Sequence, residues 1–246
     1  MPEGPSIIIL REAIDAANFK GKKVLDATGN TKIIDLKILK SKVLLDFKSF
    51  GKHFLICFDG FTLRVHFLMF GSYAINERKD RDPRLSLKFS NGELNLYTCS
   101  VKVITGNLDE VYDWSADVMN PGWDAAAAKK KIKQDPDRLV CDVLLDQDIF
   151  AGVGNIIKNE VLFRVKIQPQ TKVGAIPAKK MNELIKEAVN YSFDFLRWKK
   201  EFILKKQWLV NTKSTCSVCK GKIVRTYMGK TNRRTFYCPH CQKLYE

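Results

Sequence analysis

The sequence has no long uninterrupted apolar run, so it does not predict a helix that crosses a membrane. It also has few acidic residues. Lys and Arg number 42 against 27 Asp and Glu, which leaves a formal net charge of +15 and a pI near 9.5. The first residues do not form the pattern of a secretory signal peptide, so a cytoplasmic location is expected. The excess of positive charge favours a polyanionic partner. Nucleic acid is the first candidate, and an anionic membrane surface is the alternative.

The cysteines argue against a disulfide framework because they number seven, an odd count. Cys57, Cys99 and Cys141 stand in apolar contexts that are typical of buried free thiols. The other four form two C-x-x-C pairs separated by the 18 residues 220–237. This spacing predicts a zinc ribbon with the ligands Cys216, Cys219, Cys238 and Cys241. Four thiolates fill a tetrahedral site, so one structural zinc ion is expected, with His240 as a competing candidate ligand.

Residues 24–104 contain short runs of β-branched and aromatic residues, separated by turn signals such as Asp59-Gly60 and Asn91-Gly92. We therefore predict an antiparallel β-sandwich with a leading helix over residues 1–113. The remainder is predicted to be helical, which makes the chain an α+β protein of two domains. Its parts are expected to be a linker at 114–124, a helical domain at 125–210 and a zinc-ribbon finger at 211–246. Nothing in the sequence indicates an obligate oligomer, so a monomer is expected.

Three features predict helices in the second half. Residues 125–133 are rich in alanine and lysine, and residues 177–198 carry an amphipathic apolar stripe. Asp135, with Pro136 behind it, is a candidate helix N-cap. In addition, Gly152 and Gly154 precede Asn155 at the start of an apolar helix. Such a turn onto a helix N-terminus binds phosphate well, although a plain helix–turn–helix connection explains it equally.

Residues 1–5 read Met-Pro-Glu-Gly-Pro. If Met1 is removed, Pro2 carries a free secondary amine, and an α-amine titrates near pH ~8, so that much of it is unprotonated at neutral pH. Such an amine can attack a sugar carbon and form a Schiff base, with the Glu3 carboxylate within reach. The plainer interpretation is a helix start signal, because Pro5 suits the first turn of a helix.

Two further stretches are candidate nucleic-acid contacts. Lys52 lies in a loop between two predicted strands, either simply solvated or in contact with a phosphate. The apolar run at residues 67–71 ends another predicted strand and is either core or a wedge for a base stack. In the ribbon, residues 229–234 are the expected hairpin tip between strands at 223–227 and 235–237.

Taken together, three motifs in this order resemble bacterial DNA glycosylase/lyases of the formamidopyrimidine-DNA glycosylase and endonuclease VIII family. They are residues 2–5, the segment from Asp146 to Asn155 with Glu160 following, and the ribbon at residues 233–242. The glycine at position 4 is closer to the endonuclease VIII branch. The resemblance covers essentially the whole chain and implies damaged double-stranded DNA as the partner, within a bacterial nucleoid.

The resemblance also implies roles for individual residues. Pro2 attacks C1′ of a damaged nucleotide that is rotated out of the duplex, Glu3 is the general acid/base on the sugar, and the strand is cut by β,δ-elimination. Lys52 and Arg233 hold the phosphate backbone at the lesion, with Arg234 as the runner-up to Arg233. The remaining DNA contacts are expected at Gly154, Asn155, His66, Leu68, Met69 and Phe70.

Two positions depart from the family pattern. Ser6 stands where the family usually has a glutamate. Residues 99–106 lack the arginine and phenylalanine that the 8-oxoguanine branch carries on a loop. Oxidised pyrimidines are therefore the expected lesions. The alternatives are an 8-oxoguanine or formamidopyrimidine enzyme of the same family, and a non-catalytic DNA-binding zinc protein on the same scaffold.

Overall fold

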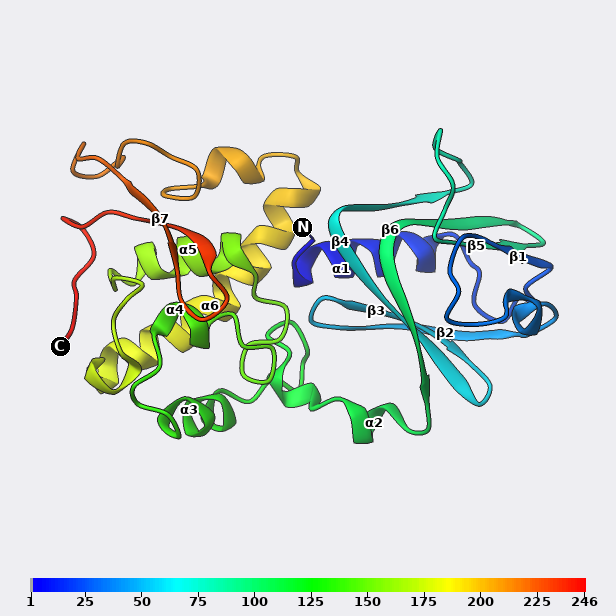
Figure 1. The fold of residues 1–246 in the computed structure, drawn as a ribbon, viewed down its shortest axis with the longest axis horizontal. Coiled ribbons are helices and arrows are strands. Elements are labelled where there is room, and N and C mark those ends of the chain that lie inside the picture. Colours follow the sequence, from blue (N-terminus) through cyan, green and yellow to red (C-terminus); the bar gives the residue numbers. More distant parts are fainter. Residues whose placement is uncertain (1) are drawn as a thin grey trace. The chain divides into compact units, whose positions relative to one another are not determined.

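The computed structural model describes residues 2–246, which divide into two compact units, one ending at Tyr112 and the other spanning Asp113–Glu246 (Figure 1). The residues expected to be a linker, 114–124, belong to the second unit, where Trp114–Ala116 forms the 3-10 helix η2. The finer division of this unit into linker, helical domain and finger stays a prediction. No helix in residues 2–246 has the length and apolar character needed to cross a bilayer.

The first unit begins with helix α1 (Gly4–Ala16), which confirms the predicted leading helix. Pro5 lies in its first turn, where the missing N–H costs nothing. Ile7, Leu10 and Ile14 recur at helical spacing and are buried, so this face joins the core of the unit.

Six antiparallel strands form the sheet of this unit, in the order β1-β5-β6-β4-β3-β2. Their bounds are β1 Asp26–Thr28, β2 Leu44–Phe50, β3 His53–Phe58, β4 Phe61–Ile75, β5 Leu85–Phe89 and β6 Gly92–Thr105. Two short helices accompany them, the 3-10 helix η1 (Leu36–Leu39) and α2 (Leu108–Val111). The Asp59-Gly60 turn joins β3 to β4 where Phe58 pairs with Phe61, as its sequence predicts.

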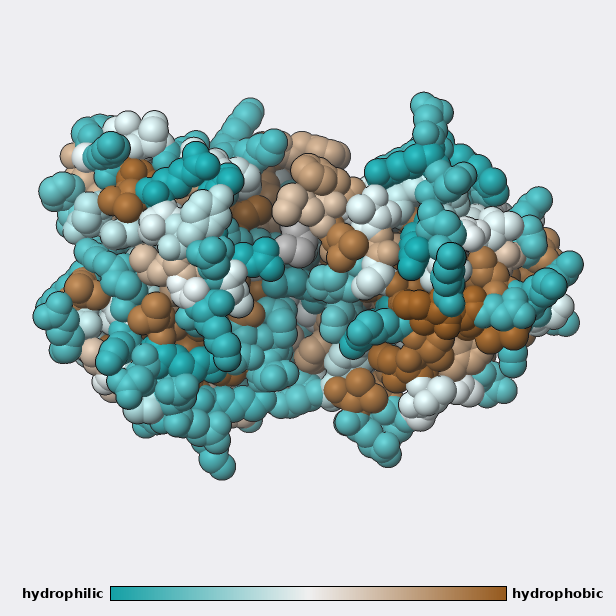
Figure 2. Space-filling view, viewed as in Figure 1, coloured by the Kyte–Doolittle hydropathy of each residue, from teal (hydrophilic) through white to brown (hydrophobic). Residues whose placement is uncertain are grey.

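The long strands β4 and β6 pair with each other at both ends and also carry the other strands, so the sheet folds into the predicted sandwich (Figure 1). Its core is filled from both parts, for example by Phe54 and Leu63 from one part and by Leu87 and Leu94 from the other. The face drawn in Figure 2 is largely hydrophilic, with an apolar patch over this sheet.

The prediction that the apolar run at residues 67–71 ends a strand is wrong. Phe67 pairs with Cys99 and Ser72 pairs with Tyr97, so residues 68–71 lie opposite the single residue Thr98 as a bulge within β4. Pairing with β6 resumes after the bulge because the strand continues to Ile75. Phe67 is buried core, whereas the next three side chains are exposed.

The second unit contains α3 (Ala125–Lys133), α4 (Val140–Val143), α5 (Asn155–Arg164) and α6 (Ala178–Lys200), with the 3-10 helices η3 (Val173–Ala175) and η4 (Leu204–Gln207). The predicted helices at 125–133 and 177–198 are confirmed as α3 and α6. The Asp124 carboxylate caps α3 by accepting from Ala126 and Ala127 N–H groups.

The prediction that Asp135 caps a helix is wrong, because α4 starts only at Val140. Leu139 is extended and bridges to Lys172, while the Gly174 N–H donates to the Pro136 carbonyl at 2.8 Å. These long-range hydrogen bonds hold the segment before α4 in a non-helical conformation.

Strands β7 (Val224–Met228) and β8 (Arg233–Tyr237) form the ribbon hairpin. Arg233 pairs with Met228, so the tip is limited to residues 229–232 and both arginines belong to β8 rather than to the tip. Outside the ribbon, Cys99 and Cys141 are buried free thiols as predicted, and Cys57 is only half-buried. Burial raises the pKa of Cys99 to about 12 and that of Cys141 to about 11, so both stay protonated at neutral pH.

Candidate functional site

The N-terminal candidates lie at the start of α1. Pro2 is half-buried and precedes Glu3, which occupies the N-cap position with an extended backbone at φ −108° and ψ 171°. The Glu3 carbonyl accepts from the Ser6 N–H at 2.8 Å, and the Glu3 side chain is only 4% exposed. A buried carboxylate is therefore fixed next to Pro2, at the positive end of the helix.

Lys52 lies in the two-residue turn between β2 and β3, as predicted. Phe50 and His53 form the last pair of the hairpin, and Gly51 supplies the left-handed backbone that the turn requires, at φ +51°. His53 pairs across the strands with His66, with ring centroids 5.4 Å apart, and its Nδ1 lies 3.3 Å from the Tyr112 hydroxyl. The hairpin thus brings an ammonium group and two imidazoles together.

Both imidazoles are neutral at pH 7. Burial, together with the positive charges of Arg64 and Lys52, lowers the pKa of His53 to about 4. Burial and the charge of Lys52 also lower the pKa of His66. The positive charge at this turn is therefore carried by Lys52, and each neutral imidazole can donate one N–H.

The bulge of β4 presents three apolar side chains to solvent: Leu68, Met69 and Phe70 are 46%, 60% and 81% exposed. Phe70 has a left-handed backbone at φ +67°, and Thr98 opposite the bulge has φ +48°. A Cβ atom on Gly71 would lie 2.7 Å from the Thr98 carbonyl oxygen, so glycine is needed where the bulge closes. Apolar side chains projecting from a strand in this way can enter a base stack.

In the second unit, the turn before α5 has the predicted form. Gly152 has φ +100°, Gly154 is the N-cap, and Asn155 is the first helical residue. The side-chain oxygen Oε1 of Gln147 accepts from the Gly152 N–H at 3.1 Å and so fixes the turn. The turn therefore places the Asn155 side chain at the positive end of α5.

The buried polar groups that join α5 to the ribbon were not predicted from the sequence. The Lys158 ammonium donates to Asn155 Oδ1 at 2.9 Å and to Thr235 Oγ1 at 2.8 Å, although Lys158 is only 1% exposed. Asn155 Nδ2 in turn donates to the Arg234 carbonyl at 2.7 Å. A possible signal was the run of three polar residues at 158–160 within an otherwise apolar helix, because part of such a run must be buried.

Glu160 is the third residue of this run and is completely buried. Its carboxylate accepts from the backbone N–H groups of Leu209, Val210 and Asn211 at 2.8 to 3.1 Å. Glu160 thereby ties the chain that leads into the ribbon to α5.

The two ribbon arginines differ in their surroundings. Arg234 donates to the Tyr227 hydroxyl at 3.2 Å, and its guanidinium carbon lies 5.8 Å from the centroid of that ring. Arg233 is exposed, and no acidic group of residues 2–246 forms an ion pair with it. Of the two, Arg233 is therefore the side chain that is free to bind an external anion.

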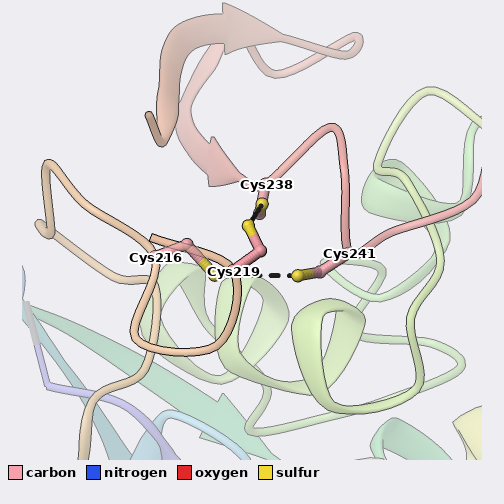
Figure 3. A group of neighbouring side chains, drawn as sticks. All are labelled: Cys216, Cys219, Cys238 and Cys241. Carbon is pink, nitrogen blue, oxygen red and sulfur yellow. Dashed lines mark hydrogen bonds between the residues drawn. The ribbon is translucent and has the colours of Figure 1, made fainter. Parts of the chain in front are cut away.

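The four cysteines of the ribbon converge, two from the segment before β7 and two from the segment after β8 (Figure 3). All their Sγ atoms lie within 4.8 Å of one another, and the Cys216–Cys241 and Cys219–Cys238 pairs are separated by 3.7 and 3.4 Å. A tetrahedral site with Zn–S bonds of about 2.3 Å has S···S edges of roughly 3.8 Å. The cluster could therefore hold a metal ion of this size, and within residues 2–246 it does not include His240.

Comparison with known proteins agrees with these features. Residues 116–194 match the formamidopyrimidine-DNA glycosylase H2TH domain. The chain is 33% identical to Endonuclease 8-like 3 of Mus musculus over 218 residues, which cover 85% of this chain and 36% of that protein. The chain thus spans about a third of the length of this relative.

Two further likenesses extend over the whole chain. It is 27% identical to a formamidopyrimidine-DNA glycosylase of Lactobacillus helveticus, with 100% of both chains covered. The fold matches a crystal structure of Lactococcus lactis formamidopyrimidine-DNA glycosylase non-covalently bound to DNA with an abasic site, with a TM-score of 0.84, 21% identity and 98% and 99% of the chains covered. The matching domain and the relatives support the formamidopyrimidine-DNA glycosylase and endonuclease VIII family for this chain, and the solved structure shows a shared fold.

Proposed function

We propose that the chain is a bifunctional DNA glycosylase/AP lyase that uses Pro2 as its nucleophile. The observation that carries the proposal is the pairing of Pro2 with the buried Glu3 at the start of α1, in a chain of this family. Removal of Met1 gives Pro2 a secondary amine, which attacks C1′ of the damaged nucleotide. The N-glycosidic bond breaks, the base leaves, and an iminium joins Pro2 to the sugar.

The same iminium explains the lyase steps. It acidifies C2′, loss of that proton expels the 3′ phosphate, and a second elimination expels the 5′ phosphate. The Glu3 carboxylate transfers protons to and from the sugar oxygen as the ring opens. DNA is held by Lys52 and His66 from the first unit and by Gly154, Asn155 and Arg233 from the second, while Leu68, Met69 and Phe70 fill the space left by the extruded nucleotide.

Borohydride trapping on DNA with an abasic site tests the nucleophile, because reduction converts the iminium into a stable covalent bond. We expect wild-type protein to be trapped and Pro2→Gly to lose nearly all trapping. Pro121→Gly is a matched control, since Pro121 is exposed in the second unit. Trapping of Pro2→Gly at the wild-type rate would remove Pro2 from the mechanism, and a wild-type protein with Met1 removed that cannot be trapped would leave only DNA binding. Mass spectrometry of the purified protein establishes whether Met1 is absent.

Oxidised pyrimidines are the proposed lesions. The 8-oxoguanine branch resembles this chain but carries an arginine and a phenylalanine on a loop, whereas residues 98–105 here form part of the continuous strand β6. Excision of thymine glycol, dihydrouracil and 8-oxoguanine from otherwise identical duplexes tests this preference. Faster release of 8-oxoguanine would contradict it.

Backbone binding is proposed for Arg233, with Arg234 held against Tyr227 and contributing less. Each lost phosphate contact lowers the salt slope of DNA binding by about one unit. We expect this decrease for Arg233→Ala and a smaller one for Arg234→Ala. The same decrease is expected for Lys52→Ala and Asn155→Ala.

In the ribbon, one structural zinc ion is proposed, bound by the four thiolates, and the protein is proposed to act as a monomer.

A further inference from the structure

The loop between β4 and β5 brings two cationic side chains to one hydroxyl group. The Lys79 ammonium donates to Ser72 Oγ at 2.8 Å, and the Arg81 guanidinium donates to the same oxygen at 3.0 Å. A hydrogen bond of 2.7 Å from the Arg81 N–H to the Lys79 carbonyl folds the backbone tightly at Asp80. This turn lets both side chains reach the same point of β4.

Tyr97 forms the platform beneath the two cations. It pairs with Ser72 across β4 and β6 and is completely buried. The Lys79 ammonium lies 5.5 Å from the centroid of the ring, the Arg81 guanidinium carbon lies 5.3 Å from it, and the Tyr97 hydroxyl accepts from the Lys79 N–H at 3.1 Å. Cation–π contacts hold each charge in place, although the two charges repel each other.

Acidic side chains do not neutralise this pair. Arg78, the preceding residue, is paired with Glu93 at 2.7 Å. By contrast, no carboxylate of residues 2–246 forms an ion pair with Lys79 or Arg81, including those of Asp80 and Asp82 in the same loop. Two positive charges and a hydroxyl group therefore converge without a counter-ion from the described chain, an arrangement that suits a phosphate.

The position of the site indicates which phosphate it receives. Ser72 is the first paired residue of β4 after the bulge, and Phe70, the most exposed side chain of the bulge, lies two residues earlier. We infer that Ser72, Lys79 and Arg81 form a second backbone-phosphate site, apart from the Lys52 hairpin, which binds the DNA strand next to the step where the bulge inserts. This inference rests on the proposed function, since it takes DNA as the partner.

The first test compares the salt dependence of duplex binding in two double variants of the full chain. Lys79→Gln with Arg81→Gln removes both cations, and the salt slope is expected to fall by about two units. Lys22→Gln with Lys23→Gln removes the same charge from an exposed pair elsewhere in the first unit and is expected to keep the wild-type slope. Equal slopes in the two double variants would overturn the inference.

The second test distinguishes a DNA phosphate from a free phosphate ion. Amide NMR signals of Ser72, Lys79 and Arg81 are followed during titration with a duplex that carries an uncleavable abasic analogue, and separately with inorganic phosphate. We expect the duplex to shift these signals at far lower concentration. Shifts with inorganic phosphate alone, or with neither, would overturn the assignment.

Borohydride trapping reports on the proposed function independently. A protein that cannot be trapped but shows the two-unit difference keeps this site and loses the activity, and the reverse result keeps the activity and loses the site.

Discussion

The Lys158 ammonium lies 2.9 Å from Asn155 Oδ1, one helical turn away in α5, and this contact fixes which end of the amide faces outward. With Oδ1 bound to the ammonium, Nδ2 points away and donates one hydrogen to the Arg234 carbonyl. An amide has two N–H donors, so the second is available to a further acceptor. We therefore expect Lys158 to be a positioning residue that holds Asn155 with a donor available for the proposed phosphate contact.

We predict that Lys158→Met lowers the salt slope of DNA binding by about one unit, as Asn155→Ala does. The double variant should lose no more than either single variant, because both remove the same contact. Lys186→Met, at an exposed lysine of α6, is the matched control and should bind as wild type does. Additive losses in the double variant would show that Lys158 supports the fold without orienting Asn155.

Glu160→Gln should destabilise the second unit. The amide keeps one acceptor oxygen but places an N–H₂ group against backbone donors. Some of the buried hydrogen bonds that the N–H groups of residues 209–211 donate to this side chain are therefore lost. The expected decrease in the free energy of unfolding is about 2–3 kcal/mol. Urea unfolding measures it, and Glu183→Gln, in the partly exposed pair with Lys180, should leave the stability almost unchanged. A similar effect of both substitutions would contradict the prediction.

Gly71→Ala should distort the bulge, because the new Cβ would approach the Phe67 Cβ to 2.8 Å and the Thr98 carbonyl oxygen to 2.7 Å. A loss of about 1–3 kcal/mol in stability is expected, together with weaker DNA binding. Met69→Ala removes an exposed side chain of the same bulge and should leave thermal stability unchanged. Thermal unfolding of both variants is the measurement, and a stable Gly71→Ala protein would show that the bulge can relax.

Stability should also depend on pH through His53. Its pKa is about 4 in the folded protein and near ~6.5 when unfolded, so between these values the unfolded chain binds the additional proton. The contribution of neutral His53 to the free energy of unfolding is therefore fully present above pH ~6.5. It is lost as the pH drops toward 4, by at most about 3 kcal/mol. Urea unfolding of wild type and His53→Gln across this range checks the sign. A His53→Gln protein with the same pH dependence would assign it to other groups.

Metal removal should affect the ribbon alone. We predict one zinc ion per chain by elemental analysis, and faster release to a chelator in Cys219→Ser than in wild type. Cys57→Ser, a half-buried thiol in β3, is the control and should retain zinc normally. Loss of zinc is expected to weaken DNA binding because β8, which begins at Arg233, is followed directly by the proposed ligand Cys238. Equal zinc retention in Cys219→Ser would exclude that thiol as a ligand.

Local patterns predicted the parts of the fold that depend on neighbouring residues. The alanine-rich run predicts α3, the amphipathic stripe predicts α6, and the cysteine spacing predicts the cluster. The failures involve partners distant in sequence. The start of α4 depends on the bridge between Leu139 and Lys172, and the bulge depends on pairing with β6. A lysine in the first turn of a helix normally lies at the surface, so the buried position of Lys158 could not be predicted without Thr235 beside it.

The bulge in β4 has one more consequence. Since β4 and β6 pair on both sides of it, from Phe67 to Cys99 and from Ser72 to Tyr97, its length is uncoupled from the register of the sandwich. Residues can be inserted or deleted there without turning any core side chain toward water. The reach of this protrusion can therefore be redesigned by changing its loop length, while the enclosing β-scaffold is left intact.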